Sequence, residues 1–148
     1  MKESITLREA VRFHGHLGPY LVLGLAAGRL ALNNLKAKKY FGLEVKVYGA
    51  SLKPKSCLID GLQLATGATY GKGNIHKFNG PEIKIEFSNK ANNSRMTLKL
   101  KKQVIEKLGK AKTHEDSELL ARELYQTDSS CIFNLRTRYL VLGTREKF

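Results

Sequence analysis

The pattern of apolar and polar positions predicts five helices. Thr6-Leu7-Arg8-Glu9 has the form of a capping box, in which a hydroxyl and a carboxylate satisfy free N–H groups at the start of a helix. Pro19 suits the first turn of a second helix, because the missing N–H of proline costs nothing there. The predicted helices run from Thr6 toward Phe13, from Pro19 to about Leu35, from a cap at Ser56 through about Leu64, around Val104–Leu108, and from a cap at Thr113 to about Leu124.

The helix predicted from Pro19 to Leu35 is apolar nearly all round, which places it at the centre of the core. Gly24 and Gly28 are four residues apart and therefore share one face of this helix, where another backbone can approach closely. We expect this face to pack within the fold, with a subunit interface as the alternative.

Alternation of apolar and polar residues with a period of two predicts five strands. They are expected at Glu44–Tyr48, Asn74–Phe78, Ile83–Phe87, Met96–Leu100 and Ile132–Leu135, with Tyr139–Leu142 as an optional continuation of the last. The segment Asn89–Ser94 is expected to form the turn between the third and fourth strands. Helices and strands are mixed without a regular βαβ alternation, so the sequence predicts a single α+β domain over residues 1–148, with a mainly antiparallel sheet packed with helices.

The composition is typical of a cytoplasmic globular protein. The two cysteines, Cys57 and Cys131, lie far apart and form no C-x-x-C pair, so neither a disulfide framework nor a zinc ribbon is indicated. The first ten residues contain no apolar stretch of the kind found in signal peptides. The longest apolar stretch, Pro19–Ala31, is interrupted by Arg29 and is shorter than the ~20 residues of a membrane span. We therefore expect no association with a membrane.

The formal net charge of +13 favours anionic partners, among which are nucleic acids, small anions and acidic proteins. The charge is spread evenly, since residues 1–74 and residues 75–148 carry +7 and +6. No arginine-rich run is present. Nucleic-acid binding would rest on charge alone and is therefore not the favoured prediction.

The first segment that points to chemistry is His14-Gly15-His16. Imidazole is a good ligand for zinc, nickel, copper or iron, and a His-x-His pair in a turn can direct two rings at one ion. The alternative is one packed and one exposed histidine.

The second segment is Ser56-Cys57-Leu58-Ile59-Asp60. If Ser56 caps the helix, Cys57 lies in the first turn, where free N–H groups and the helix dipole lower the pKa of a thiol. Asp60 lies three residues further on the same face and is placed to orient a histidine that binds a metal. A small buried cysteine beside a solvent-facing carboxylate is the alternative.

The third segment, residues 66–74, contains three glycines around Lys72. Such a loop can present backbone N–H groups and one ammonium to an anion. It is not a Walker A loop, because the glycine spacing is one residue short and Gly73 stands where a serine or threonine is required. A plain loop with positive φ angles is the competing interpretation.

The three segments together resemble the motif blocks of the FmdE family, which is named after a component of formylmethanofuran dehydrogenase. The blocks have the same order and similar spacing. They are Phe-His-Gly-His-Leu-Gly-Pro at 13–19, Cys-Leu-Ile-Asp-Gly-Leu-Gln at 57–63 and Thr-Gly-Ala-Thr-Tyr-Gly-Lys-Gly-Asn at 66–74. The likeness is sharp over residues 7–78 and weaker over Glu118–Leu135. It implies an α+β core that dimerises, with the three blocks around one pocket.

Transferred by position, the resemblance implies that His14, His16 and Cys57 bind a transition metal, with zinc as the expected ion and nickel or iron as alternatives. It gives Cys57 and Asp60 as the residues closest to any catalysis. The pocket is expected to be lined by Gln63, Thr69, Lys72 and Asn74. Two departures matter: Gly18 stands where family members often have cysteine, and the cysteine-rich tail of many members is missing.

The sequence therefore supports three hypotheses. The first is a metal-binding pocket protein that binds a small anionic molecule and assists one-carbon metabolism. The second is a metal-free enzyme with Cys57 as a thiolate nucleophile and a histidine as base. The third is a non-catalytic basic module that binds nucleic acid or an acidic partner protein.

Overall fold

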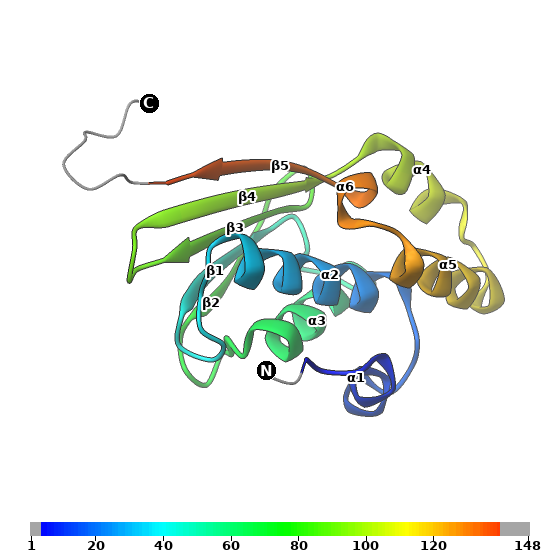
Figure 1. Ribbon diagram of the computed structural model, residues 1–148. Helices are drawn as coiled ribbons and strands as arrows, with labels where there is room; N and C mark the ends of the chain where they lie inside the picture. The colour runs from blue at the N-terminus through cyan, green and yellow to red at the C-terminus, as the bar shows by residue number, and fades with distance from the viewer. Residues whose placement is uncertain (1–3, 140–148) are drawn as a thin grey trace.

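The computed structural model describes residues 4–139 as one α+β domain with six helices and a five-stranded mixed sheet (Figure 1). The helices are α1 Leu7–His14, α2 Pro19–Asn34, α3 Cys57–Thr66, α4 Lys102–Lys110, α5 His114–Gln126 and α6 Ser129–Ile132. The strands are β1 Leu43–Tyr48, β2 Ile75–Phe78, β3 Lys84–Asn89, β4 Ser94–Leu100 and β5 Phe133–Arg138.

The strands lie in the order β2-β1-β3-β4-β5. Three of the four pairings are antiparallel, and β1 pairs with β2 in parallel. A parallel pair needs a long crossover, and the segment that contains α3 supplies it. The prediction of a mainly antiparallel sheet is therefore correct, and the one parallel pair follows from the helix between its strands.

Only one face of the sheet contributes to the core. Alternate residues of each central strand are buried, as Val45, Phe87 and Met96 show in neighbouring positions across β1, β3 and β4. These side chains join one cluster with residues of α2 and α3, such as Leu23 and Leu62. None of the helices described between residues 4 and 139 combines the length and the apolar composition that a membrane span requires.

Helices α2 and α3 lie side by side and touch through glycines (Figure 1). A Cβ atom added at Gly24 would lie 2.1 Å from the carbonyl oxygen of Leu58, and one added at Gly61 would lie 2.2 Å from that of Leu21. Further along, a Cβ at Gly28 would lie 2.6 Å from the Cβ of Ala65. The prediction that the glycine face packs within the fold is confirmed. The contacts advance along the two helices together, so α2 and α3 run in the same direction and their first turns are neighbours.

Local sequence signals place most helix starts correctly. The capping box at Thr6 is present, and the hydroxyl of Thr113 accepts a hydrogen bond from the Asp116 amide at 3.0 Å. The prediction that the Ser56 side chain caps α3 is wrong. Ser56 has helical dihedral angles, φ −64° and ψ −17°, because the turn before it already runs into the helix.

The last strand, predicted at Ile132–Leu135, differs at both ends from the observed strand β5. Ile132 closes the short helix α6, and β5 begins at Phe133. The four-residue helix has too few residues to give a periodic signal in the sequence. Of the predicted continuation Tyr139–Leu142, all but Tyr139 lies outside the described residues.

We predict that Gly61→Ala destabilises the fold by about 3 kcal/mol, because the atom opposing the new methyl group is a backbone carbonyl that cannot move aside. Gly109→Ala on α4 is the matched control, since its Cβ meets nothing within 4 Å and alanine favours a helix. Urea unfolding of both variants and the parent measures the difference. A Gly61→Ala variant as stable as the parent would show that α2 and α3 are not in close contact.

Candidate metal centre

Three side chains with metal-ligating atoms meet where α1 ends and where α2 and α3 begin. His14 is the last residue of α1, and Gly15 ends the helix with φ at +103°, a conformation that suits glycine. His16 follows in the short link to α2, and Cys57 is the first residue of α3. Because the first turns of α2 and α3 are neighbours, the His-Gly-His link lies beside the cysteine.

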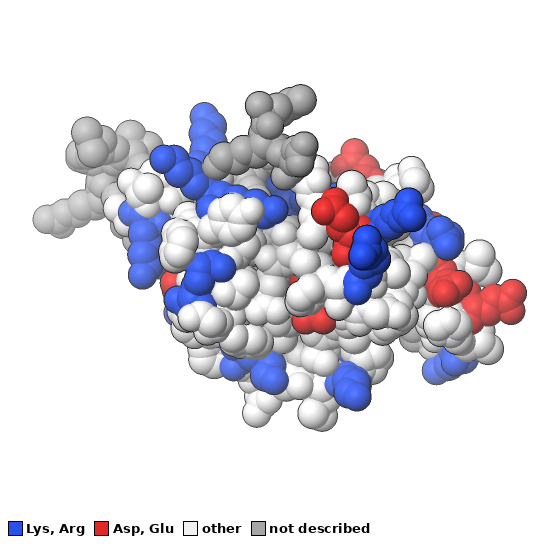
Figure 2. All heavy atoms as spheres, turned by 90° about the horizontal axis from the view of Figure 1, so that it is seen from below, with Lys and Arg blue, Asp and Glu red and all other residues white. Residues whose placement is uncertain are grey.

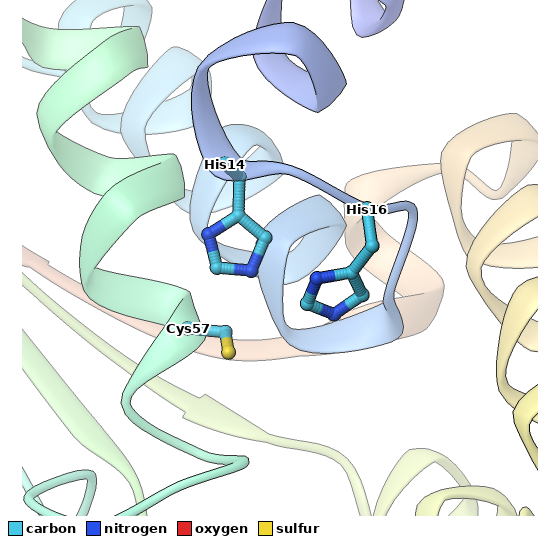
Figure 3. A group of neighbouring side chains, drawn as sticks. All are labelled: His14, His16 and Cys57. Atoms are coloured by element: carbon cyan, nitrogen blue, oxygen red, sulfur yellow. The ribbon is translucent and has the colours of Figure 1, made fainter.

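One ligand atom from each of His14, His16 and Cys57 lies within 4.8 Å of the other two. The two imidazole rings have their centroids 4.5 Å apart and are tilted by 41°. Figure 3 shows both rings and the Cys57 side chain on the same side of α3, with the sulfur below the rings in that view. The structure thus brings together the three residues that the resemblance gives as ligands.

Asp60 holds one of the histidines. Its Oδ2 lies 2.6 Å from Nδ1 of His14, whose side chain is only 9% exposed. With Nδ1–H donating to the carboxylate, Nε2 of His14 carries the lone pair. This Nε2 atom is buried and has no hydrogen-bond partner in the part of the chain that the structure describes. Buried polar atoms nearly always have a hydrogen-bond partner, so the missing partner of Nε2 suggests that a ligand binds to this atom.

The electrostatics of Cys57 differ from the prediction. Burial raises the pKa of the Cys57 thiol, the charge of Asp60 raises it further, and the charge of Lys53 opposes this to a lesser degree. The expected helix-start effect is weak because the first amides of α3 are already used: those of Cys57 and Leu58 donate to the carbonyls of Pro54 and Lys55, both at 3.1 Å. The prediction of a lowered thiol pKa is therefore wrong for the metal-free protein.

The environment of His16 disfavours its protonated form. The side chain of His16 is exposed overall, but partial burial of its ring is the largest effect that lowers its pKa; the neighbouring His14 and the more distant His114 lower it further, while Glu118 acts in the opposite direction. His114 and Glu118 belong to α5, where Nε2 of His114 lies 3.3 Å from Oε1 of Glu118. Nothing in the sequence indicated that the start of α5 faces this site, because the two segments lie far apart along the chain.

Three residues predicted to line the pocket make hydrogen bonds that hold the glycine loop. The amide of Thr69 donates to Oδ1 of Asn74 at 2.9 Å, and Nδ2 of Asn74 donates to the carbonyl of Tyr40 at 2.7 Å. Oε1 of Gln63 accepts from the amide of Tyr70 at 3.2 Å. The side chains of Gln63, Thr69 and Asn74 therefore have a structural use that accounts for their polarity.

The loop around Lys72 has the features of the plain-loop interpretation. Gly73 has φ at +71°, and the amides of Lys72 and Gly73 both donate to Thr69, to its hydroxyl and its carbonyl. The Lys72 ammonium lies 5.7 Å and 5.9 Å from the ring centroids of Phe41 and Tyr40. These two amides are used within the loop and are not available to an anion.

Sequence reasoning missed one side chain near the site. Burial raises the pKa of Tyr70, and the charge of Asp60 raises it further, so the phenol lies within the electrostatic reach of that carboxylate. Tyr70 stands between glycines in the third motif block, and its place in that block is the signal that could have found it. Cys131, the second free cysteine, is exposed on α6 and is not part of the cluster.

The fold is similar to that of a solved protein from Syntrophus aciditrophicus. That protein is described as FmdE-like, after the FmdE component of tungsten formylmethanofuran dehydrogenase, and the two structures agree with a TM-score of 0.62 at 22% sequence identity. The match covers 97% of this chain and 79% of the solved chain. At this level of identity the comparison shows a shared fold.

A curated relative matches a shorter part of the chain. It is described as a probable S-adenosyl-L-methionine-binding protein of Archaeoglobus fulgidus and is 33% identical over 70 residues. The match covers 47% of this chain but 19% of the relative, so the two correspond over about a fifth of the relative's length.

The family comparison covers most of the chain and includes all three motif blocks. A family model described as FmdE, molybdenum formylmethanofuran dehydrogenase operon, matches residues 13–136. The match begins at the Phe-His-Gly-His block, so the resemblance seen in the sequence is confirmed. This chain belongs to the FmdE family.

Proposed function

We propose that His14, His16 and Cys57 bind one transition-metal ion, with zinc as the expected ion and nickel or iron as alternatives. The observation that carries the proposal is the buried Nε2 of His14, which lacks a partner among the described residues while Asp60 fixes the opposite side of the ring. A carboxylate behind a histidine is the usual support of a histidine ligand, because it sets the tautomer and raises the basicity of the other nitrogen.

The donor set fits such an ion. Two imidazole nitrogens and one thiolate are borderline-soft ligands that suit zinc, and also nickel and iron. Three protein ligands leave a fourth position for a small molecule, as in catalytic zinc sites. His16 is exposed and Cys57 is partly exposed, so this position is accessible from solvent. A metal ion bound there supplies Lewis-acid chemistry to a molecule that enters.

The metal-free thiolate enzyme is the second candidate, and one observation favours it. Asp60, His14 and Cys57 are arranged like an acid, a base and a nucleophile, with the carboxylate orienting the imidazole. Against it, the pKa of the Cys57 thiol is raised, which keeps the thiol protonated at neutral pH. The triad also has no use for His16. The metal site uses all three donors and is the better account.

The nature of the molecule that enters stays a prediction. The sequence predicts a small anion held by Lys72, an accessory role in one-carbon metabolism, and a homodimer. Lys53 is the cation whose charge acts on Cys57, so it offers an anion more direct help than Lys72 does. The family description, which names a formylmethanofuran dehydrogenase operon, supports the link to one-carbon metabolism.

We predict that protein purified without an affinity tag contains about one zinc, nickel or iron ion per chain, and that Cys57→Ser and His16→Ala lose it. Serine is close to cysteine in size, but its hydroxyl stays protonated at neutral pH and cannot replace the thiolate as a ligand. Elemental analysis of dialysed protein measures the content, and circular dichroism checks that the variants fold.

Cys131→Ser is the matched control, because it removes the other free cysteine at an exposed position. It should keep the metal. Retention of metal by Cys57→Ser and His16→Ala would overturn the ligand assignment. Parent protein without metal that also takes up no added zinc would favour the thiolate enzyme.

Asp60→Asn tests the supporting carboxylate. The amide is close in shape but no longer charged, so we predict a metal affinity about 10- to 100-fold lower with the same metal content at saturation. Competition with a chelator of known affinity measures the change. An unchanged affinity would mean that the Asp60–His14 contact serves folding alone.

Proton competition gives the site a defined pH dependence. The thiol of Cys57 has a raised pKa and must lose its proton to bind metal, whereas His16 has a lowered pKa and is already neutral. We predict that the dissociation constant for zinc falls about tenfold for each unit by which the pH rises between pH ~6 and ~8, because binding displaces one proton, that of the Cys57 thiol. Cys57→Ser should flatten this profile as well as weaken binding. A flat profile for the parent protein would contradict thiolate ligation.

A further inference from the structure

The face of the sheet turned away from the helices carries its own organised set of side chains. Strand pairing aligns the outward residues in rows across the sheet. One row joins Lys46 with Glu86, Thr97 and Arg136, since these residues are direct partners across β1, β3, β4 and β5. The neighbouring rows place Lys84 opposite Lys99 and Arg95 opposite Arg138.

This face is strongly basic. A hollow of about 590 Å³ crosses the four strands, and among residues 4–139 its lining includes one carboxylate, that of Glu86. Six lysine and arginine side chains line the same hollow: Lys46, Lys84, Arg95, Lys99, Arg136 and Arg138. Figure 2, which views the molecule from below and not onto this face, shows basic side chains at both ends and acidic ones mainly over the middle and the right-hand side.

Two of the cross-strand pairs join like charges. Lysine faces lysine across β3 and β4, and arginine faces arginine across β4 and β5. Like charges directly opposite each other destabilise a sheet. Glu82 pairs with Lys99 at 2.8 Å and relieves part of the first repulsion. An anion lying across the Lys84–Lys99 row would be stabilised by that pair, whereas a second copy of the same face would add to the repulsion.

The same face carries aromatic rings at its β1–β2 edge. Tyr48 and Phe78 are direct partners in the sheet, and their rings stack with centroids 5.1 Å apart. Phe78 is 42% exposed, and the Lys84 ammonium lies 4.5 Å from the Tyr48 centroid. An exposed ring stacked on a half-buried one beside a basic groove is a combination on which single-stranded nucleic acids bind, with bases on the rings and phosphates on the cations.

We infer that this open sheet face binds single-stranded nucleic acid. The rings favour a single strand over a duplex, whose bases are already stacked, and over an acidic peptide, which needs only the cations. Little in the sequence indicates this face, because the six cations come from four strands spread over 93 positions, from Lys46 to Arg138. Strand pairing gathers them on one surface. The inference does not depend on the proposed metal site.

Fluorescence anisotropy with a labelled single strand of mixed sequence, about 12 nucleotides long, tests the inference on the full chain, with RNA and DNA compared. With about four phosphate contacts, the logarithm of the binding constant should fall with the logarithm of the salt concentration with a slope of about −3. Arg95→Glu with Arg136→Glu should raise the dissociation constant by about tenfold or more. Phe78→Ala should raise it about tenfold through lost stacking.

Lys102→Glu with Lys110→Glu is the matched control, because it changes the net charge equally on exposed positions of α4. It should change the dissociation constant less than ~3-fold. Thermal midpoints confirm that the variants fold, and zinc binding should be equal in all. An equal loss in the control, equally tight binding of the duplex, tighter binding of a polyglutamate peptide, or no binding at low salt would each overturn the inference.

Discussion

The contact between α2 and α3 determines what the rest of this molecule can do. Gly24 and Gly61 let the two backbones approach so closely that any side chain at either position would meet a carbonyl oxygen. The helices run in the same direction, so their first turns lie together. His14 and His16 lie just before the first turn of α2, and Cys57 is the first residue of α3. Packing of the two apolar helices against each other and against the sheet therefore brings together the three side chains that could bind a metal.

Electrostatics gives Asp60 two effects within the cluster. It reaches across from α3 to His14, holds its ring and leaves the buried Nε2 without a partner among the described residues. Burial raises the pKa of the Cys57 thiol most and the charge of Asp60 raises it further, so the thiol is a poor nucleophile when no cation is near. A bound cation removes both penalties, since it takes up the lone pair and stabilises the thiolate. Asp60 therefore favours the metal-bound state of the cluster over the metal-free state with a protonated Cys57 thiol.

Much of the fold could be predicted because its signals are local. The capping residues Thr6 and Thr113, the glycine face of α2 and the alternating strands each act through neighbours in the sequence. One failure is itself local, because the turn immediately before Ser56 already runs into the helix and removes its capping role. The hydrogen bond of Asn74 to Tyr40 joins residues 34 positions apart, and no local pattern predicts it. The three donors were found from motif resemblance, but their closeness depends on helix packing, and the basic sheet face depends on pairing between strands.

X-ray absorption at the edge of the bound metal tests most directly whether two histidines and one cysteine share an ion. For zinc, we predict one sulfur at about 2.3 Å and at least two nitrogen atoms at about 2.0–2.1 Å, with the sulfur lost in Cys57→Ser. A first shell of nitrogen and oxygen alone in the parent protein, or a sulfur that persists without Cys57, would contradict this assignment.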